Sequence, residues 1–262
     1  MTKIKLTAAI EKVKANGEKA FVPYIMAGDG GLETLSTNIL FLQEAGATAI
    51  EVGIPFSDPV ADGPTIQLSG QRALAKGVNL RLIIKELETF HKEVHVPLVL
   101  MTYYNPLLSY GLEKFAEDCE RIGISGLIVP DLPVEEMDDL QKALMQTDVA
   151  IVPLVSLTSP SERIAKIVSA GEGFIYAVTV NGTTGVRNGF NDQLEQHLAE
   201  LKELSPLPVL AGFGISTPEQ VKSIGALADG VIVGSAIVKA FNDQDLDKIR
   251  ELIQASKNKV VN

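Results

Sequence analysis

Residues 50–67 read I-E-V-G-I-P-F-S-D-P-V-A-D-G-P-T-I-Q, and this stretch sets a pattern that the rest of the chain repeats. It begins as an apolar strand and ends as a loop rich in Pro, Gly, Asp and Ser. Glu51 lies inside the strand, where an unpaired charge is costly to bury, and Asp62 lies in the loop that follows. Two carboxylates placed in this way suit an acid/base pair. Alternatively, Glu51 faces solvent, and Asp58 and Asp62 only shape turns.

Similar apolar runs recur along the whole chain, and a segment with helical spacing follows each of them. Runs this apolar are typical of strands that are covered on both faces of a parallel sheet. The predicted strands cover residues 20–27, 48–53, 96–101, 126–130, 150–155, 174–178, 208–211 and 230–233. The predicted helices cover residues 4–16, 32–45, 66–75, 80–93, 112–122, 134–145, 162–170, 193–204, 218–224, 236–241 and 246–255.

Eight strand–helix units in 262 residues are the size of a (β/α)8 barrel. The sequence therefore predicts an α/β fold of the TIM-barrel type, with an extra N-terminal helix and additional helices after strands 2 and 8. A doubly wound open sheet is the alternative, but no G-x-G-x-x-G follows the first strand. No linker or composition shift divides the chain, so we expect residues 1–262 to form a single domain.

The composition narrows the class of protein. The net charge of −10 provides no basic face of the kind that nucleic acids require. No apolar run approaches the roughly 20 residues that span a bilayer, and no apolar signal region is visible at the start. We therefore expect a soluble, cytoplasmic protein that binds neither nucleic acid nor membrane. Cys119 is the single cysteine, which excludes an internal disulfide, and its spacing places it on the apolar face of a helix.

The last two predicted strands end in small residues that lead directly into helices. Gly212, Gly214, Gly234 and Ser235 stand at these points. Glycine lets the backbone approach a ligand closely, and the free N–H groups of a helix N-terminus favour an anion. Loops after strands 7 and 8 are the usual phosphate site of this barrel class, so we predict phosphate binding here. The alternative is that these glycines only make tight turns.

Alternation along the second strand decides where its carboxylate points. Ala49, Glu51 and Gly53 share one face, while Ile50 and Val52 suit the layer between sheet and helices. Glu51 is therefore predicted to point into the barrel near its mouth, where burial raises the pKa of a carboxyl group. The alternative is that Glu51 is buried in a structural hydrogen-bonded pair.

Other common site types are not supported by the sequence. No Lys ends a predicted strand, which argues against a Schiff-base aldolase. His91 and His95 fall at the end of a helix, away from the catalytic rim, and we expect no metal site. The Gly- and Thr-rich loop after the sixth strand, which ends at Arg187, suits a mobile lid. An ordinary surface loop is the alternative for that segment.

With these residues assembled, the chain closely resembles the α subunit of tryptophan synthase over essentially its whole length. The longest shared motif is E-V-G-I-P-F-S-D-P-V-A-D-G-P-T-I-Q at residues 51–67. Others are F-V-P-Y-I-M-A-G-D, M-T-Y-Y-N-P, V-P-D-L-P-V-E-E, G-T-T-G-V-R, G-F-G-I-S and V-G-S-A-I-V. The resemblance implies retro-aldol cleavage of indole-3-glycerol phosphate to indole and D-glyceraldehyde 3-phosphate, with no metal or organic cofactor in this chain.

The resemblance also implies roles for individual residues. Glu51 would carry the protons, and Asp62 would hold the indole N–H, although Asp62 could instead only orient its loop. Further implied site residues are Gly185, Gly214, Gly234 and Ser235 for the phosphate, Phe21, Tyr103 and Tyr176 for the indole pocket, and Thr184 for closing the lid against Asp62. The early lid varies within the family, so no role is carried over to Val180 or Asn181.

A partner follows from the resemblance as well. The α subunit of the family passes indole to a β subunit that contains pyridoxal phosphate, in an α2β2 tetramer. Residues 56–63 and the loop expected at 105–110 would lie near that contact. Three alternatives remain open: a free-standing indole-3-glycerol-phosphate lyase, a non-catalytic activator of a β subunit, or another phosphate-binding barrel of amino-acid biosynthesis. The last would need a Cys, a Lys or an Asp pair at other strand ends.

Overall fold

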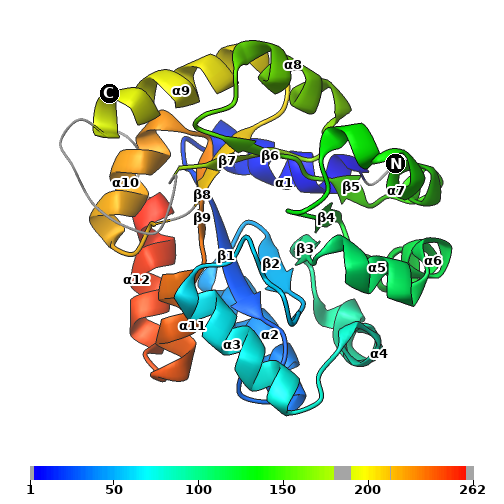
Figure 1. The fold of residues 1–262 in the computed structure, drawn as a ribbon. Coiled ribbons are helices and arrows are strands. Elements are labelled where there is room, and N and C mark those ends of the chain that lie inside the picture. Colours follow the sequence, from blue (N-terminus) through cyan, green and yellow to red (C-terminus); the bar gives the residue numbers. More distant parts are fainter. Residues whose placement is uncertain (1–2, 180–189, 213, 258–262) are drawn as a thin grey trace.

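The computed structural model describes residues 3–179, 190–212 and 214–257, and its strands form one parallel sheet curled into a barrel (Figure 1). Neighbouring strands follow the order β5-β4-β3-β2-β1-β9-β8-β7-β6. The strands are β1 (Ala20–Met26), β2 (Ile50–Gly53), β3 (Leu98–Met101), β4 (Gly126–Ile128), β5 (Ala150–Ile151), β6 (Leu154–Ser156), β7 (Ile175–Val178), β8 (Val209–Gly212) and β9 (Gly230–Val233). The predicted α/β barrel is thereby confirmed.

Helices surround the strands on the outside of the ring (Figure 1). They are α1 (Lys3–Ala15), α2 (Leu35–Ala45), α3 (Pro64–Ala75), α4 (Leu80–Phe90), α5 (Tyr104–Tyr110), α6 (Leu112–Ile122), α7 (Asp138–Leu144), α8 (Ser161–Ala170), α9 (Phe190–Leu204), α10 (Pro218–Leu227), α11 (Ser235–Asn242) and α12 (Leu246–Lys257). Three short 3-10 helices join them: η1 (Leu32–Thr34), η2 (His91–Glu93) and η3 (Val134–Glu136). The extra helices expected at the N-terminus, after β2 and after β9 are therefore present.

The fifth predicted strand, residues 150–155, is interrupted and forms β5 and β6 instead of one strand. Pro153 stands between the two pieces and has no N–H for the ladder. The barrel still closes through this segment. The Val152 N–H donates to the Leu127 carbonyl at 2.9 Å on one side, and the Pro153 carbonyl accepts the Tyr176 N–H at 2.9 Å on the other.

Helix α5 corrects a second expectation, because residues 105–110 were expected to be a loop. Pro106 occupies the third position of α5, within the first turn, where its missing N–H has no intrahelical partner to lose. The helix is only 7 residues long, too short to give a clear periodic signal. The structure thus places an ordered element immediately after β3.

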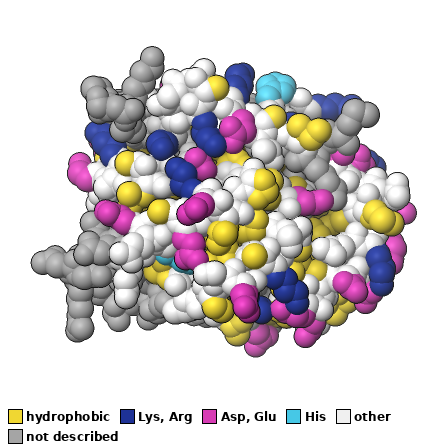
Figure 2. Space-filling model, turned by 90° about the horizontal axis from the view of Figure 1, so that it is seen from above, with side chains coloured by type: hydrophobic (Ala, Val, Ile, Leu, Met, Phe, Trp, Pro, Cys, Tyr) yellow, Lys and Arg dark blue, Asp and Glu magenta, His cyan; other side chains and the backbone are white. Residues whose placement is uncertain are grey.

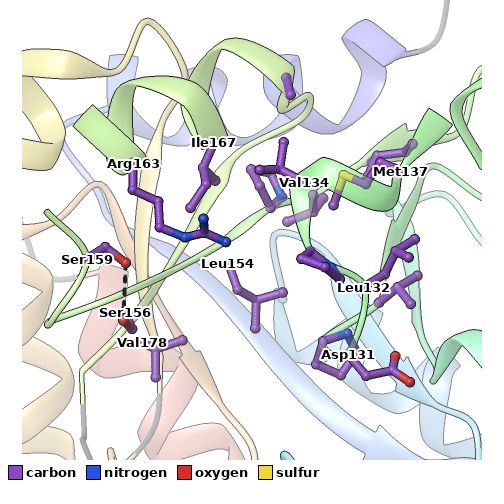
Figure 3. Close-up of a pocket in the computed structure, with 17 residues that line it drawn as sticks. Asp131, Leu132, Val134, Met137, Leu154, Ser156, Ser159, Arg163, Ile167 and Val178 are labelled. Atoms are coloured by element: carbon purple, nitrogen blue, oxygen red, sulfur yellow. Dashed lines mark hydrogen bonds between the residues drawn. The ribbon is translucent and has the colours of Figure 1, made fainter. Parts of the chain in front are cut away.

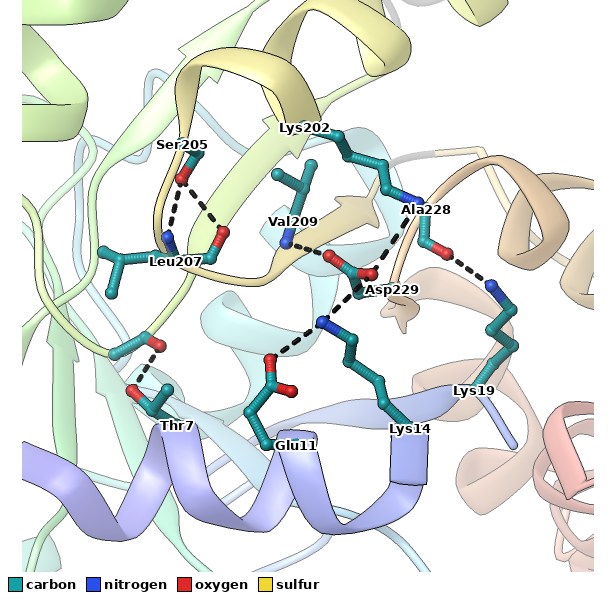
Figure 4. A network of polar contacts seen from close by, with 11 residues as sticks. Thr7, Glu11, Lys14, Lys19, Lys202, Ser205, Leu207, Val209, Ala228 and Asp229 are labelled. Carbon is teal, nitrogen blue, oxygen red and sulfur yellow. Dashed lines mark hydrogen bonds and ion pairs between the residues drawn. The ribbon is translucent and has the colours of Figure 1, made fainter. Parts of the chain in front are cut away.

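The N-terminal helix α1 crosses behind the strands in Figure 1 and covers the N-terminal end of the barrel. Polar contacts fix it there (Figure 4). The Thr7 hydroxyl donates to the Gly173 carbonyl at 2.7 Å, and Lys14 Nζ lies 3.4 Å from Asp229 Oδ1. The other oxygen of Asp229 accepts the Val209 N–H at 2.9 Å at the start of β8. Since α1 covers the N-terminal ends of the strands, the end of the barrel formed by their C-terminal ends is available for a site.

The charged surface and the buried position of the single cysteine agree with what the composition and spacing of the sequence predicted. On the face shown in Figure 2, Asp and Glu side chains lie among Lys, Arg and hydrophobic side chains. Cys119 is buried on the inner side of α6, as its spacing predicted. Within the described ranges, none of the helices has the length and apolar character needed to cross a membrane.

Candidate active site

Glu51 lies on β2 and points into the barrel, as the alternation of that strand predicted. It pairs in register with Tyr24 of β1 and Val99 of β3, and only 1% of its surface is exposed. Neither carboxylate oxygen has a hydrogen-bond partner among the described residues. Burial, followed by the nearby charge of Asp62, raises the pKa of Glu51 to about 8. Glu51 is therefore a neutral acid at pH 7 and can donate a proton.

Asp62 lies in the loop between β2 and α3, where it is partly buried. Burial raises its pKa to about 6, and a hydrogen bond from the Tyr103 hydroxyl opposes that shift. The same hydroxyl accepts the Ala61 N–H at 3.0 Å. The Gln67 side-chain amide donates to the Asp62 carbonyl at 2.8 Å. At pH 7, one carboxyl of the pair is thus protonated and the other is ionised.

Two tyrosines reach into the barrel beside these carboxylates. Tyr24 shares the inward face with Glu51, and a Cβ added at Gly53 would overlap its phenol ring. Tyr176 likewise lies over Gly212, where an added Cβ would overlap its ring. Burial, with the charges of both carboxylates, raises the pKa of each phenol well above its ordinary value. The two glycines therefore provide the space in which the aromatic walls of the site lie.

Phe21 does not lie with this group, although the family resemblance implied a place for it in the indole pocket. It is buried on β1 and pairs with Val231, three positions before Tyr24 in the chain. Residues three apart on a strand have opposite faces, so Phe21 points away from the barrel interior. Tyr24 takes its place as the inward aromatic residue of β1. The sequence alone did not single it out, because every neighbour of Tyr24 in this strand is also apolar.

The candidate phosphate site lies at the ends of β8 and β9, two adjacent parallel strands. Gly214 follows β8 with φ +81°, a backbone conformation that glycine adopts readily. Gly234 precedes the first residue of α11, Ser235, so the unpaired N–H groups of that helix start here. A Cβ at Gly234 would lie 3.7 Å from the Cβ of Tyr24. The helix start is therefore next to the strand that carries the inward tyrosine.

The remaining residues implied for the lid and the phosphate lie outside the described part of the chain. These are Thr184 and Gly185, and the gap at 180–189 also contains Val180, Asn181 and Arg187. The mobile-lid hypothesis for this segment stays a prediction.

A cavity of about 310 Å³ lies beside the mouth of the barrel, between the loop after β4 and helix α8 (Figure 3). Leu132, Val134 and Ile167 line it with apolar side chains, while Asp131 and Arg163 add polar groups. Leu154 lines it too and pairs in register with Tyr176, so the cavity lies next to one aromatic wall of the site. The interrupted strand β5–β6 thus borders this cavity on one side of the site.

A metal site would require ligating side chains to converge within the described ranges, residues 3–179, 190–212 and 214–257. Within them, no three His, Cys, Asp or Glu side chains converge on a point that could hold a metal ion. His91 is only partly buried and its ring nitrogen contacts the Glu88 carbonyl at 2.9 Å, at the end of α4.

Comparison with known proteins supports the family that the motifs indicated. The family model for the tryptophan synthase alpha chain matches residues 10–261. Tryptophan synthase alpha chains of Bacillus thuringiensis (strain Al Hakam) and Bacillus anthracis are each 53% identical over 253 residues, covering 95% of this chain and 98% of the relative.

Solved structures give the same result at lower identity. The tryptophan synthase alpha chain of Legionella pneumophila subsp. pneumophila superposes with a TM-score of 0.88 at 32% identity over 100% of both chains. A chain of tryptophan synthase from M. tuberculosis reaches 0.87 at 33% identity, covering 97% of this chain and 99% of that one. The chain therefore belongs to the tryptophan synthase alpha chain family, the lyases that cleave indole-3-glycerol phosphate.

Proposed function

We propose that Glu51 and Asp62 carry out the retro-aldol cleavage of indole-3-glycerol phosphate to indole and D-glyceraldehyde 3-phosphate. One observation carries this proposal. The Glu51 carboxyl group is fully buried, has no hydrogen-bond partner among the described residues, and lies near the charge of Asp62. Both residues lie at the end of the barrel where two glycine loops lead into helices. The bond to indole C3 can break only after C3 is protonated, because the ring must accept the bonding electrons. The site therefore needs an acid and a stabiliser of positive charge.

The different pKa values of the pair assign these two roles. Neutral Glu51 donates its proton to C3, and ionised Asp62 accepts the indole N–H, which stabilises the positive charge that develops on the ring. Glu51 is then a carboxylate and takes the proton of the side-chain hydroxyl. The C–C bond breaks as the aldehyde forms, and its electrons restore the aromatic ring. The protons balance, and Glu51 ends the cycle as it began.

The rest of the substrate fits the neighbouring groups. Gly214, Gly234 and Ser235 provide backbone N–H groups for the phosphate, joined in this proposal by Gly185. Tyr24 and Tyr176 form the aromatic walls for the indole, and Tyr103 lies at the edge of the pocket. Thr184 closes the lid against Asp62. We propose that no cofactor is needed in this chain, because side chains supply each proton transfer.

The rate of cleavage is expected to follow a bell-shaped dependence on pH, with its maximum at about pH 7. Below a pH of about 6, Asp62 gains a proton and no longer stabilises the charged ring; above about 8, Glu51 loses the proton that it must donate. The pH dependence of kcat/KM measures both limbs. In Asp62→Asn the acid limb should disappear from the residual activity, and the alkaline limb should move to lower pH because one charge near Glu51 is gone. An unchanged acid limb in that variant would contradict the assignment.

We further propose that a β subunit docks beside β2 and β3 and receives the indole, in an α2β2 tetramer whose pyridoxal phosphate lies in the β subunit. Apolar side chains are exposed on this side: Val60 is 82% exposed and Leu108 of α5 is 52% exposed. Val60 precedes Ala61, whose N–H donates to the Tyr103 hydroxyl, and α5 begins directly after Tyr103. A partner on this side would therefore lie next to the site. A cytoplasmic location accords with the free, buried thiol of Cys119.

Release of indole from indole-3-glycerol phosphate by the purified chain, with and without a cognate β subunit, tests the function directly. Slow release by the chain alone and a large gain on mixing are expected. High activity that the β subunit does not change would favour the free-standing lyase. No release by the chain alone, with activation of the partner only, would favour the non-catalytic activator. No effect of either kind would overturn the proposal.

A further inference from the structure

The loop that carries Asp62 is folded around one side chain, Tyr103. This residue follows β3 and immediately precedes α5, and only 3% of its surface is exposed. Its ring stacks on Phe56, with ring centroids 5.2 Å apart and an angle of 29° between the planes. Its hydroxyl accepts the Ala61 N–H at 3.0 Å and lies near the carboxylate of the next residue, Asp62. Both the beginning and the end of the loop thus contact a single phenol.

The chemistry of the hydroxyl fixes the direction of these bonds. A phenol has one proton to donate and lone pairs to accept with. Since the Ala61 N–H can only donate, the hydroxyl proton remains available to the neighbouring Asp62 carboxylate. Such a bond to an ionised acceptor is stronger than one between neutral groups, and it favours the ionised form of the acid. A hydrogen bond from Tyr103 to one oxygen of Asp62 would leave the other oxygen for a ligand.

We propose that Tyr103 is a positioning residue, whose hydroxyl holds the Asp62 carboxylate in the orientation that receives the indole N–H. The inference rests on the proposed role of Asp62 and adds the group that fixes it. This positioning role differs from lining the pocket. A phenylalanine in place of Tyr103 would line the pocket and stack on Phe56 equally well. Only the hydroxyl connects the ring to the carboxylate.

The test is Tyr103→Phe, measured as indole release by the full chain alone and with a β subunit. We expect kcat to fall by about tenfold, the effect of losing one hydrogen bond to a charged group, with little change in KM. The acid limb of kcat/KM should move up by about one pH unit, because the bond that favours ionised Asp62 is gone. The matched control is Tyr104→Phe, whose hydroxyl faces Asp139 and Glu136 instead of the site, and which should behave as the wild type.

Two further measurements separate positioning from damage to the fold. Titration of the Asp62 carboxyl by 13C NMR, assigned with Asp62→Asn, should show the same upward shift in Tyr103→Phe whether or not the protein turns over substrate. In the Asp62→Asn background, Tyr103→Phe should cause no additional loss of activity, because its effect passes through the carboxylate. An unshifted Asp62 titration, or an equal loss in both backgrounds, would overturn the inference while leaving the proposed cleavage intact. Failure of wild-type cleavage would instead overturn the proposed function and leave the titration result standing.

Discussion

Glu51→Gln is expected to lower the rate of indole release by at least about 100-fold, the lower end of what general acid–base catalysis contributes. Gln has the same size as Glu and no proton of comparable acidity, so the variant keeps the shape of the site but cannot protonate C3. Glyceraldehyde 3-phosphate should bind nearly as tightly as before, because the glycine loops that we propose for the phosphate are unchanged. Single-turnover indole release and titration with that ligand measure the two effects. Normal turnover would show that another group is the acid.

The same variant should be more stable than the wild type at alkaline pH. The pKa of Glu51 rises from an ordinary 4.5 to about 8 in the folded protein, so folding favours its protonated form. The two proteins should have similar unfolding free energies near the ordinary pKa. As the pH rises through the folded value, the wild type should lose roughly 3–5 kcal/mol relative to Glu51→Gln. Urea unfolding over a pH series measures the difference, with Glu113→Gln on the exposed face of α6 as the control for replacing a surface carboxyl group.

Gly53→Ala should damage both the fold and the activity, because this glycine provides the space for the Tyr24 phenol. An added Cβ would overlap the hydroxyl oxygen and two ring carbons of Tyr24. Overpacking of this kind destabilises a core by about 1–3 kcal/mol, and here it also displaces an aromatic wall next to Glu51. We therefore expect a lower free energy of unfolding and a higher KM for the substrate.

Gly63→Ala is the matched control for stability. Gly63 lies in the loop after the same strand, with φ −75°, and a Cβ there would meet nothing within 4 Å. Urea unfolding of the two variants separates the effect of the Tyr24 contact from the general effect of replacing glycine in this region. Equal stability of both variants would show that Tyr24 moves aside without cost.

The barrel and the carboxylate pair could be predicted from the sequence because both depend on regular spacing. Alternation along β2 placed Glu51 inside, and the recurring strand–helix units placed Asp62 at the same end as the glycine loops. The aromatic walls could not be predicted in this way. In β1 the residues on both faces are apolar and buried, so only its register with β2 shows that Tyr24, and not Phe21, faces Glu51.

The connections within the site also lay beyond the sequence. Tyr103 is distant in the chain from Ala61 and Asp62, and its approach to them depends on how an irregular loop folds back. The extent to which burial shifts the pKa of each carboxyl group depends on the same packing. Helix α5 was missed because it is a single short element with a proline in its first turn.

The interruption of the barrel at Pro153 bears on how new substrate preferences could be introduced. The ladder is short there, and the residues of β5 and β6 border the cavity shown in Figure 3. Replacing Leu154 by a smaller residue would enlarge that space beside Tyr176 while leaving the long strand β1 and its pairings untouched. Engineering for indoles with bulky ring substituents would therefore begin at Leu154, since β5 and β6 contribute only two and three residues to the sheet.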